Sequence, residues 1–230
     1  MKSIKSMKGQ QSGFTLVEIA IVLVIIGLLL GGILKGQELI NSAKVKALIT
    51  DMRNIQTQIY GYQDKFKQLP GDDSRTASNL TGATAGTNAT LGNGQIEGAL
   101  FPVDTGTGGT ASTDETAVFW QHLRLSNLAA GPTALGQTGY LPLNANNGRI
   151  GVSTATPTQI QIAGMPTGGT QICMTQIPGK FAKQLDLNLD DGIGNTGSVR
   201  ATLDANAGTP LSAGVATPTD GDLYTVCMVF

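Results

Sequence analysis

Hydrophobic and polar positions divide the chain into a short polar start, one long apolar segment and a mixed remainder. Leu, Ile and Val occupy twelve of the sixteen positions from Ile19 to Leu34. At their usual value per residue they favour insertion into a bilayer by about 4–7 kcal/mol. Residues 14–36 are long enough to cross a membrane as a helix. The preceding Lys2, Lys5 and Lys8 hold the N-terminus in the cytoplasm, so we expect one membrane pass and an exported remainder.

A narrow apolar stripe continues the helical pattern beyond the membrane segment. Its members recur at spacings of three and four: Val45, Leu48, Met52, Ile55, Ile59, Tyr62 and Phe66. This spacing places them on one face of a helix. We expect the globular domain to pack against this face, with a coiled-coil partner as the alternative. Leu69-Pro70-Gly71 ends the helix, because proline disfavours helical backbone before it and glycine permits the turn.

Alternating polar and apolar positions and one terminal apolar run predict short strands in residues 70–230. The predicted strands are Ile150–Ser153, Gln159–Ala163, Gln171–Thr175 and Leu223–Phe230, with a hairpin turn at Thr167–Thr170. We expect these strands to form an antiparallel sheet that covers one face of the long helix.

Two short helices and one loop region complete the predicted globular part. Ser112-Thr113-Asp114-Glu115 has the spacing of a capping box and opens a helix that extends through Leu128. A second helix runs from Pro178 to Leu187. Residues 71–113 are rich in Gly, Thr, Ala, Asn and Ser, which predicts a loop region on the surface. Glycosylation and partner binding are alternative uses of this region.

Composition narrows the class of protein. Only 13% of the residues are charged, the net charge is −1, and the 31 glycines are about twice the usual share. These values agree with a loop-rich exported domain. The charge gives no electrostatic footprint for nucleic acid; a local basic patch of Lys180, Lys183 and Arg200 is the alternative. The single histidine, His122, has no clustered Asp, Cys or Ser, so we expect it to be structural. Because the chain contains no nucleophile elbow, phosphate loop or zinc spacing, we do not expect an enzyme.

The two cysteines, Cys173 and Cys227, lie on the exported side in this topology. An oxidising compartment favours a disulfide between them. The bond would join the C-terminal stretch to a segment about fifty residues earlier and stabilise the fold by about 4 kcal/mol through loop closure. A metal or redox pair is the competing interpretation, but it lacks the close Cys-x-x-Cys spacing.

One carboxylate, Glu18, stands at the start of the apolar segment. A charge at this position needs a cation and marks a functional site by default. A cut after Gly13 would create an α-amino group on Phe14, four residues away on the same helix. The alternative is a peripheral glutamate that extends to the membrane interface.

The segment Gly13-Phe14-Thr15-Leu16-Val17-Glu18, between a basic leader and an apolar run, resembles the cleavage and methylation site of type IV prepilins and type II secretion pseudopilins. The resemblance implies that prepilin peptidase removes the leader 1–13 and methylates the new N-terminus at Phe14. It further implies that Glu18 pairs with the N-terminus of an adjacent subunit. Removal of the three leader lysines leaves twelve basic and sixteen acidic residues, a net charge of −4.

The same resemblance implies an α+β, pilin-like fold. Its long N-terminal helix, residues 14–69, has a membrane-spanning assembly part at 14–36 and an amphipathic part that packs on a small antiparallel sheet. The globular domain 70–230 carries the loop region 71–113 and a C-terminal disulfide loop.

The implied function is that of a structural subunit of a type IV pilus or related pseudopilus. No proline precedes Pro70, a departure from many pilins that favours a minor pilin or a pseudopilin. The implied partners are other pilin subunits, prepilin peptidase, the inner-membrane assembly platform and membrane lipid. The implied location is the bacterial inner membrane, then a periplasmic pseudopilus or a surface pilus. A type II secretion pseudopilin and a pilus-associated adhesin or binding module are the alternatives.

An acidic segment carries the remaining candidate chemistry. Asp186-x-Asn188-x-Asp190-Asp191-Gly192 partly resembles an Asp-x-Asp-x-Asp-Gly calcium loop. It has an extra aspartate before the glycine and lacks the later bidentate glutamate. We therefore favour a turn in which the aspartates accept backbone hydrogen bonds, and expect no cofactor. Calcium is the alternative, with Asp186, Asn188, Asp190 and Asp191 as its candidate ligands.

Overall fold

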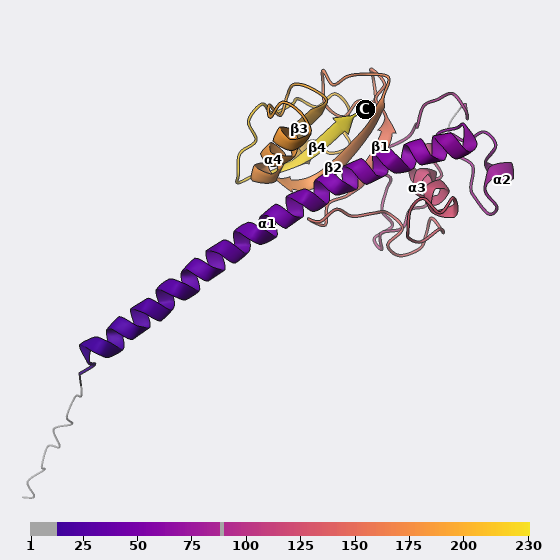
Figure 1. The fold of residues 1–230 in the computed structure, drawn as a ribbon. Helices are drawn as coiled ribbons and strands as arrows, with labels where there is room; N and C mark the ends of the chain where they lie inside the picture. Colours follow the sequence, from indigo (N-terminus) through magenta and orange to yellow (C-terminus); the bar gives the residue numbers. More distant parts are fainter. Residues whose placement is uncertain (1–12, 88–89) are drawn as a thin grey trace, which may run out of the picture. The chain divides into compact units, whose positions relative to one another are not determined.

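The computed structural model describes residues 13–87 and 90–230 of the chain, so the leader residues 1–12 lie outside it. The elements labelled in Figure 1 are α1 (Leu16–Phe66), α2 (Thr76–Asn79), α3 (Glu115–Leu125), β1 (Ile150–Thr154), β2 (Thr170–Pro178), α4 (Gly179–Leu189), β3 (Val199–Leu203) and β4 (Leu223–Val229). Two compact units divide the chain, the first ending at Ala43 and the second running from Lys44 to Phe230. We describe each unit separately.

The first unit carries the apolar part of α1. Every side chain from Ile19 to Leu34 is exposed in the single chain. Within the described residues, α1 contains a segment long and apolar enough to cross a membrane, judged by length and composition. A surface this apolar needs lipid or another protein to cover it.

In the second unit, the predicted stripe of α1 enters the main hydrophobic core. Val45, Leu48, Met52, Ile55, Ile59 and Tyr62 are buried, and Phe66 packs against them. Residues of α3, α4 and the sheet belong to the same cluster. The stripe therefore packs within its own chain, as we expected. The helix ends at Phe66 because Lys67 adopts a left-handed backbone with φ of 56°, three residues before Pro70.

The sheet has four antiparallel strands in the order β1-β2-β4-β3. Three predicted strands are confirmed as β1, β2 and β4. The strand at Gln159–Ala163, and with it the hairpin at Thr167–Thr170, is wrong: the segment forms turns, and Ile162 makes an isolated bridge to Ser212. Its alternating pattern reflects the buried Gln161 side chain, whose amide donates to backbone oxygens of a later loop. The edge strand β3 was not predicted.

Both faces of the sheet are covered. Alternate residues Ile172 and Met174 of β2 face the main core, which also contains the buried side of the three helices α1, α3 and α4. Cys173 and Cys227 lie in a second cluster, with Leu100, Phe101, Ile160 and Ile162. Irregular segments therefore cover the face of the sheet that the helices leave uncovered.

The region 71–113 differs from the expected surface loop. Its regular structure is the short helix α2, but Ile96, Leu100 and Phe101 are buried in the two clusters. The Asp72 carboxylate accepts hydrogen bonds from the backbone N–H groups of residues 92–94, which holds the region against the core. These partly buried hydrogen bonds satisfy backbone N–H groups that no helix or strand pairs.

The predicted capping box before α3 is wrong. The Ser112 N–H donates to Thr110 Oγ1, and the N-cap is Asp114, whose side chain makes no capping bond. The Glu115 carboxylate instead accepts the Glu97 N–H at 2.7 Å. Tertiary contacts therefore replaced the local bond that the spacing predicted. The helix also ends at Leu125, before the expected Leu128.

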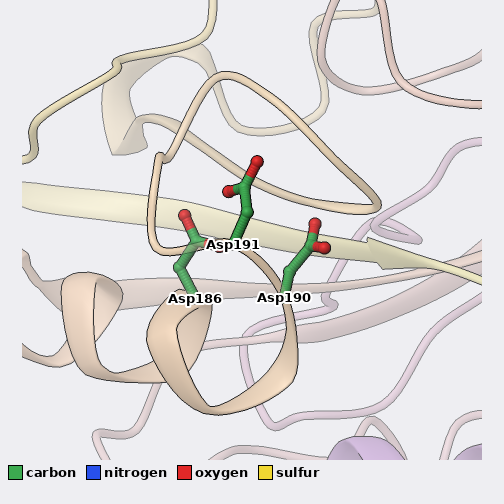
Figure 2. A group of neighbouring side chains, drawn as sticks. All are labelled: Asp186, Asp190 and Asp191. Atoms are coloured by element: carbon green, nitrogen blue, oxygen red, sulfur yellow. The ribbon is translucent and has the colours of Figure 1, made fainter.

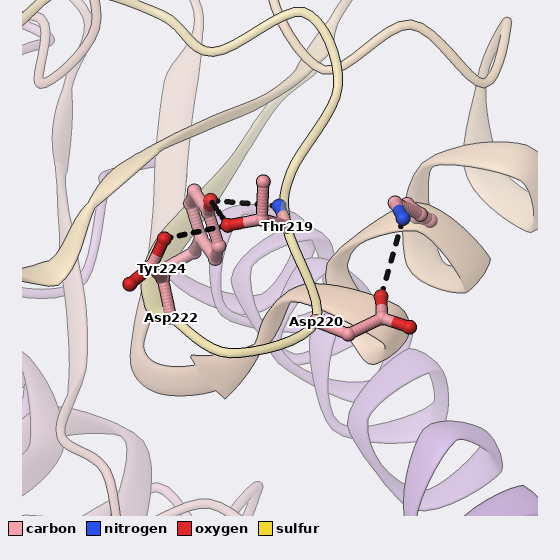
Figure 3. A network of polar contacts seen from close by, with 5 residues as sticks. Thr219, Asp220, Asp222 and Tyr224 are labelled. Carbon is pink, nitrogen blue, oxygen red and sulfur yellow. Dashed lines mark hydrogen bonds and ion pairs between the residues drawn. The ribbon is translucent and has the colours of Figure 1, made fainter.

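A polar network holds the loop before β4 (Figure 3). The Thr219 N–H donates to the Tyr224 hydroxyl at 2.8 Å, and Thr219 Oγ1 donates to Asp222. Lys183 of α4 forms an ion pair with Asp220 at 3.2 Å. The loop is thus fastened to α4 and to the first residues of β4.

Candidate processing and assembly site

The first turn of α1 forms a complete capping box. Thr15 Oγ1 accepts the Glu18 N–H at 3.2 Å, and Glu18 Oε2 accepts the Thr15 N–H at 3.1 Å and the Thr15 hydroxyl at 3.0 Å. This is the Thr-x-x-Glu pattern that satisfies orphan donors at a helix start. This role of Thr15 was not predicted, although the spacing of Thr15 and Glu18 in the sequence already has the pattern.

The capping bonds place Glu18 at the N-terminal end of the apolar helix, where a negative charge is favourable. Among the described residues, both side-chain bonds of this carboxylate use Oε2. The second oxygen, Oε1, is therefore available to a cation from outside the turn. Capping and pairing are compatible roles for one carboxylate.

The predicted cut site lies directly before this turn. Gly13 and Phe14 are both exposed, and Phe14 exposes 81% of its surface. A side-chain carbon added at Gly13 would have no neighbour within 4 Å. An enzyme can therefore reach the Gly13–Phe14 bond without displacing any described part of the fold.

The predicted disulfide is confirmed. Cys173 and Cys227 are bonded, face each other in the central strand pair β2–β4, and are fully buried. The bond closes a sequence separation of 54 residues that contains α4, β3 and the loop before β4.

The structure brings together three of the four candidate metal ligands. Ligand oxygens of Asp186, Asp190 and Asp191 lie within 4.8 Å of one another at the end of α4 (Figure 2). The side-chain amide of the fourth candidate, Asn188, donates to the Gln184 backbone oxygen along the helix.

His122 is a buried link between two segments. Its Nδ1 accepts the Gly71 N–H at 3.0 Å, and its Nε2 lies 2.8 Å from the Thr84 backbone oxygen. Accepting at Nδ1 requires a neutral ring, which then donates from Nε2. Burial lowers the pKa of His122 and reinforces this state. These are the contacts of a structural histidine.

Comparison with known proteins identifies the N-terminal segment. The family described as the prokaryotic N-terminal methylation motif matches residues 8–34. The matched range contains Gly13, Phe14, Glu18 and most of the apolar segment, and is the prepilin-type cleavage and methylation site. It is consistent with the type IV pilin and pseudopilin family. No curated protein and no solved structure matches the chain.

Outside the matched residues, the fold is of the kind that this motif leads us to expect. A long N-terminal helix, a four-stranded antiparallel sheet and the Cys173–Cys227 disulfide make a pilin-like α+β fold. The chain thus combines an N-methylation motif with a pilin-like fold.

Proposed function

We propose that the chain is a minor pilin, a structural subunit assembled into a type IV pilus or a related pseudopilus. The observation that carries the proposal is the methylation motif at residues 8–34, joined to an apolar helix whose side chains have no cover within the first unit. A filament of packed helices covers such a surface, and so does a bilayer before assembly.

Processing is the first step of the proposed function. Prepilin peptidase cuts between Gly13 and Phe14 and methylates the new amino group of Phe14. The exposed bond and the open space at Gly13 support this step. The apolar helix stays with the mature chain, anchored in the inner membrane with the second unit outside the cytoplasm.

Assembly then uses the charge on Glu18. In the filament, Glu18 of one subunit meets the N-terminal amine of a neighbour, so that neither charge is buried alone among apolar helices. The capping box supports this role because it orients the carboxylate at the helix end and leaves Oε1 available among the described residues.

N-terminal mass spectrometry of protein from membranes and from sheared surface material tests the proposal. A chain that begins with methylated Phe14 in both fractions supports a surface-assembled pilin. Methylated Phe14 in membranes alone points to a periplasmic pseudopilus, the type II secretion alternative. A chain that starts at Met1 in every fraction contradicts the proposal and leaves a membrane-anchored binding module.

Two substitutions separate pairing from capping. Glu18→Gln retains an oxygen that accepts the Thr15 N–H but removes the charge, whereas Thr15→Ala removes the cap and keeps the charge. We expect the Glu18→Gln chain to be cleaved normally but to be strongly reduced in filaments, and Thr15→Ala to assemble at near wild-type levels. Normal incorporation of Glu18→Gln would contradict the pairing role.

A third substitution tests the cut site. Gly13→Val adds carbon atoms where the structure has space, so it leaves the fold unchanged. We expect it to block cleavage and leave a precursor in the membrane, as an immunoblot of precursor and mature chain would show. Normal maturation would mean that the peptidase cuts elsewhere.

A further inference from the structure

A cavity of about 250 Å³ opens between α1, α3 and the part of the chain that leads into β1. It lies within the second unit. Its walls include three polar side chains and three apolar ones: Asp51, Trp120 and Arg124, and Ile55, Leu143 and Ile150. Cavities that hold drug-sized ligands measure about 300–1,000 Å³, so this cavity suits a smaller molecule.

The guanidinium of Arg124 is buried in the cavity wall without a counter-ion. Arg124 is 8% exposed, and its Nη1 donates to the Pro132 backbone oxygen at 2.8 Å. Its Nε is buried without an acceptor among the described residues. The guanidinium lies over the Tyr140 ring at 4.8 Å, a contact that attracts the cation but does not neutralise it. None of the ion pairs between described residues involves Arg124, and a buried cation of this kind favours an anionic ligand.

Trp120 adds a second unsatisfied donor to the same wall. It is 4% exposed, and its indole Nε1 has no acceptor among the described residues, although buried indole N–H groups usually have one. Trp120 and Arg124 are four residues apart in α3 and therefore lie on one face of the helix. The guanidinium carbon of Arg124 is 6.0 Å from the centroid of the Trp120 ring. The two oxygens of one carboxylate group suit this pair of donors.

An acid lines the same cavity from α1. Asp51 is half-buried, and within the described part of the chain its side chain makes no hydrogen bond or ion pair. Burial raises the pKa of Asp51, as expected of a carboxylate that loses water without gaining a cation. Asp51 and Arg124 line one cavity yet form no ion pair with each other. A ligand that carries both charges gives each of them a partner.

We propose that the cavity binds an apolar α-amino acid as a zwitterion. The carboxylate of the ligand accepts hydrogen bonds from Arg124 and Trp120, and its ammonium group pairs with Asp51. The apolar side chain of the ligand packs on the wall formed by Ile55 and Ile150, which removes apolar surface from water. The site selects molecules that carry both charges, because an analogue that lacks one charge leaves a protein group unpaired.

Titration of the purified full-length chain with leucine, valine and methionine tests the site. A non-ionic detergent keeps the apolar helix in solution without supplying either charge. Trp120 is the single tryptophan of the chain and lines the cavity, so its fluorescence should change and saturate as the ligand binds. Isothermal titration should show one ligand molecule per chain, and the thermal unfolding midpoint should rise with ligand concentration.

Two analogues of leucine test the two charges separately. Isocaproate lacks the amino group and isopentylamine lacks the carboxylate, while both keep the branched apolar chain. Each analogue leaves either Asp51 or Arg124 without its partner. We therefore expect each to bind the wild type about tenfold or more weakly than leucine does.

Two variants and two matched controls locate the binding. Asp51→Asn and Arg124→Met each remove one charge from the cavity wall, and we expect each to weaken leucine binding about tenfold or more. Asp64→Asn removes an exposed carboxylate of the same helix α1, and Arg149→Met removes a guanidinium that lies over the Phe101 ring at 4.9 Å. Both controls should bind leucine within about twofold of the wild type. Because the Asp51 side chain makes no bond to the described fold, Asp51→Asn keeps the test valid if Arg124→Met does not fold.

Three results would each overturn the inference. One is no saturable binding of any of the three amino acids at millimolar concentration, which would show that water alone fills the cavity. Another is equal affinity for leucine and isocaproate, which would contradict the pairing of the ammonium group with Asp51. The third is wild-type affinity for leucine in both Asp51→Asn and Arg124→Met. Because the titrations use unassembled protein, none of these outcomes depends on filament assembly.

Discussion

Glu115 makes the stability of the second unit depend on pH. Its side chain is fully buried at the start of α3. Burial raises the pKa of Glu115 from 4.5 to about 7; the Glu97 N–H opposes the rise, and the charges of Asp72, Glu97 and Asp114 add to it. The folded chain therefore holds a proton that the unfolded chain releases between these pH values. Because the pKa is raised on folding, this stabilisation is present below pH 4.5 and is lost as pH rises through 7.

The size of the effect follows from the two pKa values. The difference between 4.5 and about 7 corresponds to at most about 3 kcal/mol, and relaxation of the surroundings around the ionised carboxylate reduces this to about 1–2 kcal/mol. Glu115→Gln is neutral at every pH and keeps an oxygen for the Glu97 N–H. We expect the variant to match the wild type near pH 5 and to be about 1–2 kcal/mol more stable at pH 8.

Urea unfolding of the full chain in detergent, followed by fluorescence of the single tryptophan Trp120, gives the free energy of unfolding at several pH values. Asp64→Asn is the matched control, because it removes an exposed carboxylate paired with Lys67. The control should follow the wild type at every pH. If Glu115→Gln and the wild type differ by the same amount at pH 5 and pH 8, the proposed proton on Glu115 is refuted.

Three further predictions concern the second unit. Replacing both Cys173 and Cys227 by alanine removes a link across 54 residues and should lower the unfolding free energy by about 4 kcal/mol; unchanged urea stability would contradict this. Replacing His122 by leucine leaves two backbone groups without their partner and should cost about 2–3 kcal/mol at pH 7, measured in the same way, whereas a cost near zero would exclude the link. Ile59→Ala should lower the unfolding free energy by about 2–4 kcal/mol because the residue is 1% exposed, and the same change at its half-buried neighbour, Gln58→Ala, serves as the comparison.

The local sequence pattern was sufficient to predict the elements near the N-terminus. The apolar run from Ile19 to Leu34 and the spacing of Val45 to Phe66 each repeat over several turns, so one helix with two different surfaces followed from periodicity. The methylation motif could be recognised because its residues are contiguous. The disulfide followed from the expected compartment and the presence of two cysteines.

Long-range contacts determine the structure of the segments that the local sequence pattern predicted wrongly. Gln161 alternates with isoleucines as in a strand, yet its amide satisfies backbone groups almost fifty residues away. The edge strand β3 was missed because pairing with β4 selects it, through Val199–Met228 and its neighbours. Short segments have weak local preferences, so tertiary pairing determines their structure.

The acidic group shows the same division between sequence and structure. The spacing of Asp186, Asn188, Asp190 and Asp191 indicated a turn with calcium as the alternative, but it could not show which of their carboxylates lie together. The fold brought the carboxylates of Asp186, Asp190 and Asp191 together, with Asp186 buried. Sequence alone was sufficient to predict the long apolar helix, the methylation motif and the disulfide, because these depend on composition and on neighbouring residues. Tertiary structure decided the order of the strands, the cover on the second face of the sheet and the arrangement of the aspartates, because each depends on contacts between residues far apart in the chain.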